Sequence, residues 1–347
     1  MKLLLISGPR YSINACDFSM FFRNSDHEVI KVLHHKMIAQ KDWFFSGEYS
    51  GSSRNGICCK LTDHKRESYS GNSELLKKIY KTDFDYLCVG NGNDDTGKIL
   101  TKEYKGNILY SEYGFLPWQE NFYIDDQGVG PLSSITKMDI DKIKVTESDK
   151  KEISRIKQKL DIGSEYMWRD YVYVPLQVDT PTSDGNPDFK FQFTQFKNNI
   201  EFLNHVRKIV PKDVPILVKN HPASRKPTHI PSDMIDISHK SYNKRFIYQN
   251  MLGMICMNST SVLEALLFDK PVFTFGKDIF SNKGLTIEGA TKDDLEKILG
   301  RTRWLPSEND KFISVLLQRQ VNRSLCKDKE YVKKHYWNQE LLNRTSE

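Results

Sequence analysis

Short apolar runs that end in turn or polar residues are the feature that most constrains how this chain can fold. Four of them occupy the first part of the sequence, at residues 2–6, 29–33, 86–89 and 107–110. Each has the length of a buried strand, and a stretch with helical spacing, residues 73–80, precedes the third. Strands that alternate with helices in this way favour a parallel sheet covered by helices.

A second series of the same kind begins after a charged stretch. Its apolar runs lie at residues 171–178, 215–219, 254–257 and 271–275, with helical patterns at 200–209 and 261–268. The charged stretch, residues 141–161, contains no Gly or Pro and is typical of a solvated helix or connector. The sequence therefore predicts an α/β protein with two Rossmann-like domains facing an interdomain cleft. We place the first at residues 1–160 and the second at 161–347, with the last helix able to return to the first domain.

Length and composition restrict the class of protein further. A chain of 347 residues exceeds what one core usually supports, and 38% hydrophobic residues exclude wholesale disorder. No apolar stretch reaches the roughly 20 residues that span a bilayer, and the six Cys lack metal-binding or disulfide spacing, so we expect a cytoplasmic protein. The diffuse net charge of +6 suits anionic ligands or an acidic membrane surface and predicts no nucleic-acid partner.

Polar residues after the predicted strands are candidates for a site, because parallel α/β sheets bind ligands beyond the carboxyl ends of their strands. Glu112 follows the run at 107–110 and precedes an aromatic-rich segment, where partial desolvation would suit its carboxylate for proton transfer. Gln177 and Asp179 end the first run of the second series. Asp179 could be a nucleophile, a base or a ligand contact, or it could simply begin the turn that follows.

A third group, Lys219, His221 and Pro222, follows the run at 215–219. Ammonium and imidazole groups at a strand end can donate hydrogen bonds and positive charge to a phosphate. A lone His is also common at the surface or in a core, so the sequence leaves this role open.

The fourth group opens the predicted helix at 261–268 and contains Asn258, Ser259, Thr260 and Ser261. The free N–H groups of a helix start, joined by hydroxyls, form an anion site. Ser261 and Glu264 also match a capping box, in which each side chain bonds the other's backbone, so a purely structural role is the alternative.

Together, these segments resemble the bacterial retaining β-Kdo transferases of capsule and lipopolysaccharide biosynthesis, of the capsule polysaccharide synthesis type, over about residues 105–280. The resemblance implies a GT-B-like fold and transfer of Kdo from CMP-Kdo to a bacterial surface glycan or glycolipid. It implies that Asp179 is the nucleophile and Glu112 the acid/base. The implied donor-binding residues are Gln177, Lys219, His221, Pro222, Asn258, Ser259, Thr260, Ser261 and Glu264, with Glu264 on the ribose.

Two points of the resemblance concern the nucleophile and the metal. Several members carry an acidic residue four positions after the Gln, where this chain has Pro181, so Asp184 is an alternative to Asp179. CMP leaves with one phosphate, whose charge a His, hydroxyls and a helix terminus can offset, so we expect no metal and no cofactor beyond the CMP-Kdo donor. The D-x-D patterns at residues 83–85 and 139–141 lie away from the predicted ligand edge.

Other functions share these features. A transferase of another CMP-linked acidic sugar, such as a sialyltransferase, would bind the phosphate of its donor through the same kinds of residues. A sugar-nucleotide epimerase or hydrolase could use the same fold and would turn over without an acceptor. A non-enzymatic basic module, with peripheral association at the cytoplasmic face of the inner membrane or with a synthesis complex, is suggested by Lys327, Lys329, Lys333 and Lys334.

Overall fold

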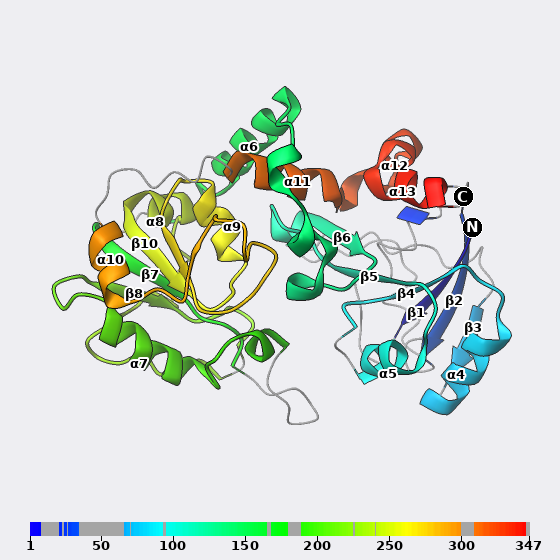
Figure 1. Ribbon diagram of the computed structural model, residues 1–347, viewed down its shortest axis with the longest axis horizontal. Helices are drawn as coiled ribbons and strands as arrows, with labels where there is room; N and C mark the ends of the chain where they lie inside the picture. Colours follow the sequence, from blue (N-terminus) through cyan, green and yellow to red (C-terminus); the bar gives the residue numbers. More distant parts are fainter. Residues whose placement is uncertain are drawn as a thin grey trace. The chain divides into compact units, whose positions relative to one another are not determined.

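The computed structural model describes residues 1–7, 21–22, 24–25, 27–34, 66–69, 71–92, 95–164, 168–179, 189–224, 226–239, 241–299 and 309–344 (Figure 1). Its contacts divide the chain into two compact units: unit 1 is Met1–Ser134 with Leu316–Glu347, and unit 2 is Ile135–Val315. This division differs from the predicted domains 1–160 and 161–347. Residues 135–160, including the charged connector, group with unit 2, and residues 316–347 group with unit 1.

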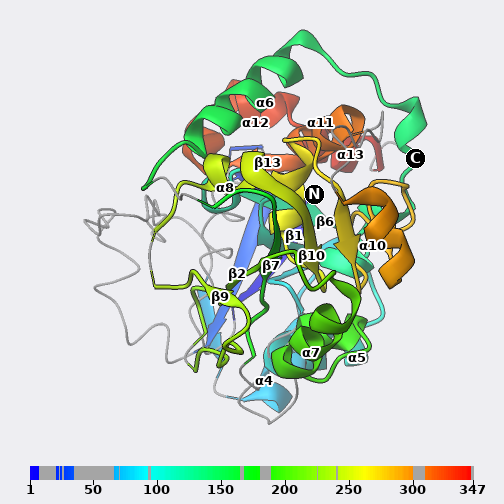
Figure 2. The ribbon, with the colours of Figure 1, turned by 90° about the vertical axis from the view of Figure 1, so that its left-hand side faces the viewer.

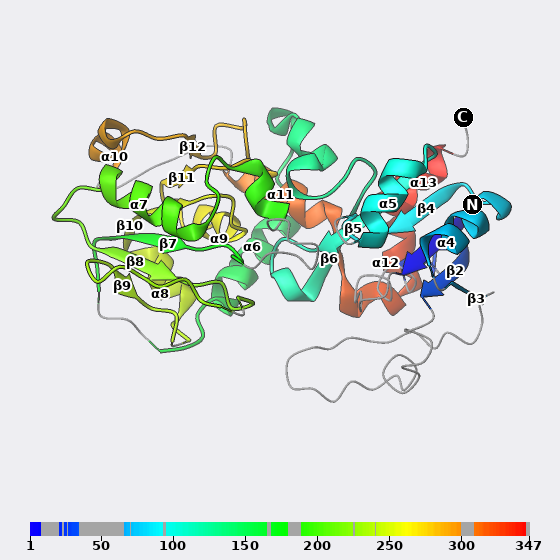
Figure 3. The same cartoon turned by 90° about the horizontal axis from the view of Figure 1, so that it is seen from below.

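Unit 2 contains a six-stranded sheet in which every pair of neighbours is parallel. Its order is β12-β11-β10-β7-β8-β9, which can be followed across the sheet in Figure 3. The strands are β7 (Tyr171–Pro175), β8 (Ile216–Lys219), β9 (Ile235–Asp236), β10 (Met251–Cys256), β11 (Val272–Thr274) and β12 (Ile287–Glu288). The chain leaves β7 in one direction to β8 and β9, then returns to the other side with β10. A topological switch point therefore lies between β7 and β10, which run side by side in Figure 2.

Unit 2 contains six helices or parts of helices among its described residues. They are α6 (Glu147–Lys159), α7 (Asn199–Ile209), α8 (Lys244–Asn250), α9 (Ser261–Leu266), α10 (Lys292–Ile298) and the start of α11 (Asn309–Arg319). Phe202 and Val206 of α7 and Leu295 of α10 join one core with the strands. Figure 1 shows α7 on one side of the sheet and α8 with α9 on the other. The connector helix α6 begins at a capping box between Thr146 and Asp149, with bonds of 3.1 and 2.9 Å.

Unit 1 contains a seven-stranded sheet in the order β13-β6-β5-β4-β1-β2-β3. Its strands are β1 (Lys2–Ser7), β2 (Glu28–His34), β3 (Arg66–Tyr69), β4 (Tyr86–Val89), β5 (Ile108–Tyr113), β6 (Asn121–Asp125) and β13 (Gln320–Asn322). The first five are parallel, whereas β6 is antiparallel to both β5 and β13. The sequence predicts the parallel strands β1, β2, β4 and β5 but not β3 or the antiparallel pair.

The two faces of the unit 1 sheet are covered by different parts of the chain. Leu4 and Ile6 of β1 pack against α4 (Asn72–Lys81) and α5 (Asp95–Glu103). Leu3 and Leu5 face the other way, toward α12 (Lys329–Lys334) and α13 (Tyr336–Arg344), where Trp337 is buried (Figure 1). Successive side chains of β1 point to opposite faces of the sheet, so the strand contributes apolar side chains to both helical layers.

Candidate functional site

Two amide side chains meet at the switch point of unit 2. Gln177 follows β7, Asn258 follows β10, and Gln177 Nε2 donates to Asn258 Oδ1 at 3.1 Å. Asn258 is fully buried, and its Nδ2 donates to the carbonyl oxygen of Lys190 at 2.8 Å. The Lys190 ammonium in turn pairs with buried Asp278, which follows β11. These bonds fix the loops after three neighbouring strands at the edge where parallel sheets bind ligands.

Asp179 lies in the loop after β7, beyond Gln177, and is partly exposed. Its Oδ2 accepts a hydrogen bond of 3.1 Å from the backbone N–H of Asn199, the first residue of α7. The Asn199 side chain is fully buried, and its Nδ2 donates to the carbonyl oxygen of Gln177 at 2.9 Å and to Thr228 Oγ1 at 3.0 Å. The alternative nucleophile, Asp184, lies outside the described residues.

The predicted phosphate-binding group after β8 occupies the same edge of the sheet. Lys219 is the last residue of the strand; its burial and the nearby Lys244 lower the pKa of its ammonium, and Glu264 opposes that change. His221 Nδ1 accepts a hydrogen bond of 3.1 Å from the backbone N–H of Ala223, so the ring proton resides on Nε2. Pro222 follows and is exposed at the loop surface.

The group before α9 differs from the expectation of a capping box. The N-cap residue is Thr260, whose side chain makes no capping bond, and Ser259 Oγ accepts instead from the N–H of Ser261 at 3.2 Å. Glu264 does not reach back to the helix start, so the predicted Ser261–Glu264 capping box is wrong. Ser259 is buried, Thr260 is exposed and Ser261 is partly exposed.

Glu264 is held by two side chains from α8. Lys244 Nζ lies 2.7 and 3.0 Å from its two carboxylate oxygens, and the Tyr248 hydroxyl donates to Oε2 at 2.5 Å. These contacts compete with the capping arrangement, because charged and hydroxyl donors bind a carboxylate more strongly than one backbone N–H. Burial, followed by the nearby Glu264 charge, raises the pKa of the Tyr248 phenol well above its ordinary value. Tyr248 therefore stays protonated and remains a donor.

In unit 1, Glu112 lies within β5 rather than after it. The strand continues to Tyr113 because its antiparallel partner β6 pairs Glu112 with Tyr123. Asn91, in the turn after β4, donates from Nδ2 to Glu112 Oε2 at 2.8 Å, and the Tyr113 N–H donates to Oε1 at 2.7 Å. Each carboxylate oxygen thus accepts one hydrogen bond, and the two bonds fix the orientation of the side chain.

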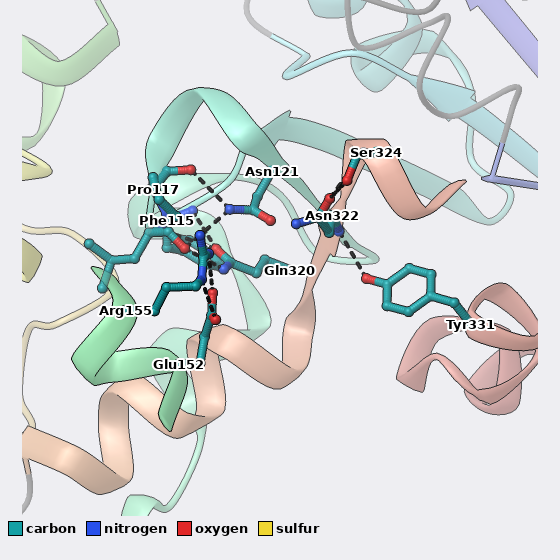
Figure 4. A network of polar contacts seen from close by, with 10 residues as sticks. Phe115, Pro117, Asn121, Glu152, Arg155, Gln320, Asn322, Ser324 and Tyr331 are labelled. Carbon is teal, nitrogen blue, oxygen red and sulfur yellow. Dashed lines mark hydrogen bonds and ion pairs between the residues drawn. The ribbon is translucent and has the colours of Figure 1, made fainter. Parts of the chain in front are cut away.

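The loop after Glu112 is fixed by amide side chains of β13 and β6, as Figure 4 shows. Gln320 accepts from the N–H groups of Phe115 and Leu116 at 3.0 Å each and donates to the Leu116 carbonyl oxygen at 2.6 Å. Asn121 Nδ2 donates to the carbonyl oxygens of Leu116 and Pro117 at 3.1 and 2.9 Å. A Cβ at Gly114 would lie 2.3 Å from Asn121 Cβ, so only Gly allows this close approach.

Asp125, at the end of β6, has a structural role. It is buried and accepts hydrogen bonds from the N–H groups of Gln127, Gly128 and Ser134 and from the hydroxyl groups of Ser133 and Ser134. These hydrogen bonds fix the loop after β6, so Asp125 serves the architecture of unit 1.

The structure adds site residues that no sequence motif indicates. Asn199, Lys244 and Tyr248 belong to helices, and Asn91 to a Gly-Asn-Gly turn, so none follows a recognisable motif. Their partners lie far away in sequence. In the described part of the chain, no group of three or more His, Cys, Asp or Glu side chains could hold a metal ion. Among those same residues, no helix is both long and apolar enough to cross a membrane.

Comparisons with known proteins relate this chain to polysaccharide biosynthesis. Residues 142–303 match the family model described as capsule polysaccharide biosynthesis protein. The chain is 22% identical over 325 residues to protein FixF of Sinorhizobium fredii, covering 88% of this chain and 76% of that protein.

Two solved structures extend the comparison. One is the β-Kdo 2,7 transferase of Thermosulfurimonas dismutans KpsC, with a TM-score of 0.55 and 15% identity over 96% of this chain and 99% of the other. The other is the β-Kdo 2,4 transferase of the same KpsC, with a TM-score of 0.48 and 14% identity over 72% and 83%.

These findings confirm the α/β, GT-B-like fold with two Rossmann-like units and the resemblance to the capsule-synthesis type of protein. The match between the family model and this chain falls on unit 2, which carries the switch-point residues Gln177, Asp179 and Asn258. Residues 142–303 of the chain are thus similar to the capsule polysaccharide biosynthesis protein family.

Proposed function

We propose that the protein is a retaining glycosyltransferase that moves Kdo from CMP-Kdo to a bacterial surface glycan or glycolipid. The observation that carries this proposal is the cluster of polar side chains at the switch point of unit 2, where Gln177, Asp179 and Asn258 are held by direct hydrogen bonds. The family match of that unit and its fold likeness to a β-Kdo transferase support the same reaction. The proposal places the reaction in the cytoplasm, where the acceptor glycan or glycolipid would be available.

The phosphate of CMP would be bound by protein groups alone. His221 presents its ring N–H through Nε2, because Nδ1 already accepts from Ala223. Thr260 offers an exposed hydroxyl group, and Lys219 a nearby ammonium. These donors would stabilise the charge that develops on the departing phosphate. Transfer should therefore survive EDTA; a loss of activity that Mg²⁺ or Mn²⁺ restores would contradict this part of the proposal.

Retention requires two displacements at the anomeric carbon. In the first, an Asp179 oxygen forms a bond to that carbon while the bond to CMP breaks and CMP leaves with the electron pair. In the second, the acceptor hydroxyl oxygen attacks the same carbon, its proton passes to Glu112, and the bond to Asp179 breaks. Asp179 is restored as a carboxylate, and Glu112 then releases its proton to water.

The test is incubation of the full chain with CMP-Kdo and a panel of acceptor glycans, followed by mass spectrometry. The proposal expects a Kdo increment on an acceptor and release of CMP. Turnover of CMP-sialic acid but not CMP-Kdo would favour the sialyltransferase-like alternative. Consumption of the donor at the same rate without any acceptor would favour a hydrolase or epimerase.

A further inference from the structure

The Asp179 carboxylate is held on one side only. Its Oδ2 accepts the 3.1 Å hydrogen bond from the Asn199 N–H, and among the described residues no hydrogen bond reaches Oδ1. The residue is partly exposed, so a substrate can approach it. A carboxylate with one oxygen fixed and the other open has the arrangement that an aimed nucleophile needs.

The donor of that hydrogen bond belongs to the start of a regular helix. Asn199 is the first residue of the eleven-residue helix α7, whose N-cap, Asn198, accepts from the N–H of Glu201 at 2.9 Å. The first N–H groups of a helix have no partner within the helix, and the helix dipole favours an anion beside them. Asp179 thus uses an N–H that the helix itself leaves available.

The Asn199 side chain anchors the same loop at a second point. Its Nδ2 donates to the Gln177 carbonyl oxygen at 2.9 Å, so one residue holds both ends of the segment from Gln177 to Asp179. Asn199 is fully buried, yet its Oδ1 has no hydrogen-bond partner among the described residues. An unpaired buried acceptor destabilises a fold, and such local costs concentrate at functional sites.

We infer that Asn199 is a positioning residue for the proposed reaction: its backbone N–H orients the Asp179 carboxylate, and its side chain fixes the loop that carries it. This inference rests on the proposed function, in which Asp179 is the nucleophile. Asn199 itself does not contact the reacting atoms.

Two substitutions at the same position separate the two contributions. Asn199→Ala removes the amide side chain but keeps the N–H, whereas Asn199→Pro removes both. Proline is well tolerated at the first position of a helix, where its missing N–H breaks no helical bond. The preceding residue, Asn198, has φ −159° and ψ 171°, the extended conformation that a following Pro requires. The difference between the variants therefore reports the N–H bond to Asp179.

We expect kcat with CMP-Kdo to be about ten- to a hundredfold lower in Asn199→Pro than in Asn199→Ala, as for loss of one hydrogen bond to a charged group. Calorimetric CMP affinity and donor KM should agree between the two variants within about twofold, because the N–H acts on the reacting carboxylate rather than on CMP. Equal kcat values would overturn the inference.

Two controls keep the result decisive. If Asn199→Pro does not fold by circular dichroism, an amide-to-ester replacement at residue 199 removes the same N–H without a ring, and the same comparison applies. Asp179→Asn is measured in parallel. If Asp179→Asn is inactive while Asn199→Pro and Asn199→Ala have equal kcat values, only the positioning role of Asn199 fails. If it turns over normally, or if the wild type transfers no CMP-linked sugar, the proposed function fails and the inference with it.

Discussion

The two units contain similar parallel sheets but hold their candidate carboxylates in different ways. In unit 2, Asp179 lies in a loop beyond the strand end, with one oxygen open among the described residues, and side-chain amides link that loop to the neighbouring strands. In unit 1, Glu112 lies inside β5, with a hydrogen bond to each carboxylate oxygen. The difference matters for the proposed roles, because an attacking group needs an open oxygen, whereas Glu112 is oriented through both of its oxygens.

The supporting structures differ as well. The loops of unit 2 are fixed by residues between β7 and β11, within one continuous stretch of chain. The loop after β5 is fixed by Gln320. Its hydrogen bonds to Phe115 and Leu116 join residues that are 205 and 204 positions apart in the sequence. Unit 1 therefore depends on the packing of its C-terminal strand and helices, and unit 2 does not. The predictions below test this contrast.

Replacing the open carboxylate should have the largest effect. Asp179→Asn is expected to lower kcat by at least about a thousandfold while CMP binding and folding persist, because the lost interaction forms only during reaction. Steady-state kinetics and calorimetry measure the two quantities. In Glu112→Gln, which slows the second displacement, a Kdo adduct should accumulate on the peptide that contains Asp179.

The position of the adduct and the product configuration decide between alternatives. Fragmentation of that peptide locates the adduct, and an adduct on Asp184 instead of Asp179 would make Asp184 the nucleophile. Product with inverted configuration would exclude a covalent adduct altogether and leave Glu112 as the general base.

Acid should destabilise the C-terminal segment of unit 1, which contains β13, α12 and α13. His335 is buried; its Nδ1 accepts from the Trp337 N–H at 3.3 Å and its Nε2 lies 3.1 Å from the Gln320 carbonyl oxygen. Burial lowers the pKa of His335 from 6.5 to about 4. Between these pH values the unfolded chain binds a proton that the folded chain does not, so stability falls as the pH falls. The free energy of unfolding should fall by about 3 kcal/mol at pH 4, at about 1.36 kcal/mol for each pH unit.

Hydrogen exchange at pH 7.5 and 4.5, corrected for intrinsic rates, measures this loss in each unit. The matched control is His335→Gln, which cannot titrate. Peptides of α12 and α13 should lose protection at low pH more in the wild type than in the variant. Equal loss in both proteins would show that other groups control the acid response.

Replacing a predicted phosphate-binding residue of unit 2 should have a smaller effect. His221→Ala is expected to weaken CMP binding about ten- to a hundredfold, as for loss of one charge-assisted hydrogen bond. Calorimetry on the folded variant measures the change. Unchanged affinity in a folded His221→Ala variant would remove His221 from the site.

The sequence predicted much of the framework and less of the site. The apolar run at 86–89 coincides with β4, and the pattern at 200–209 differs from α7 by one residue at its start. β5 extends past its predicted end because pairing with β6 uses backbone groups, which an apolar pattern does not reveal. The run at 171–178 overshoots β7, whose last residue is Pro175.

Contacts between distant residues explain what the sequence could not predict. The Ser261–Glu264 pair has capping-box spacing, but Lys244 and Tyr248, 20 and 16 positions away, take the carboxylate instead. Likewise Asn199 and Asp179 are joined by a hydrogen bond although they lie 20 positions apart in the sequence. Such pairs depend on where the helices pack, and a local motif carries no information about that placement.

The smallest expected effect tests whether Glu264 is part of the donor site or only of the fold. Tyr248→Phe removes the 2.5 Å bond to Glu264 Oε2 but leaves Lys244 in place on both oxygens. Because one donor remains, we expect the KM for CMP-Kdo to rise only about three- to tenfold, with kcat unchanged. Tyr173→Phe is the matched control: Tyr173 is also buried, and no hydrogen bond between it and Glu264 occurs among the described residues. If both variants raise KM equally, the hydroxyl bond to Glu264 is not the cause, whereas a change confined to Tyr248→Phe would place α8 behind the donor site of unit 2.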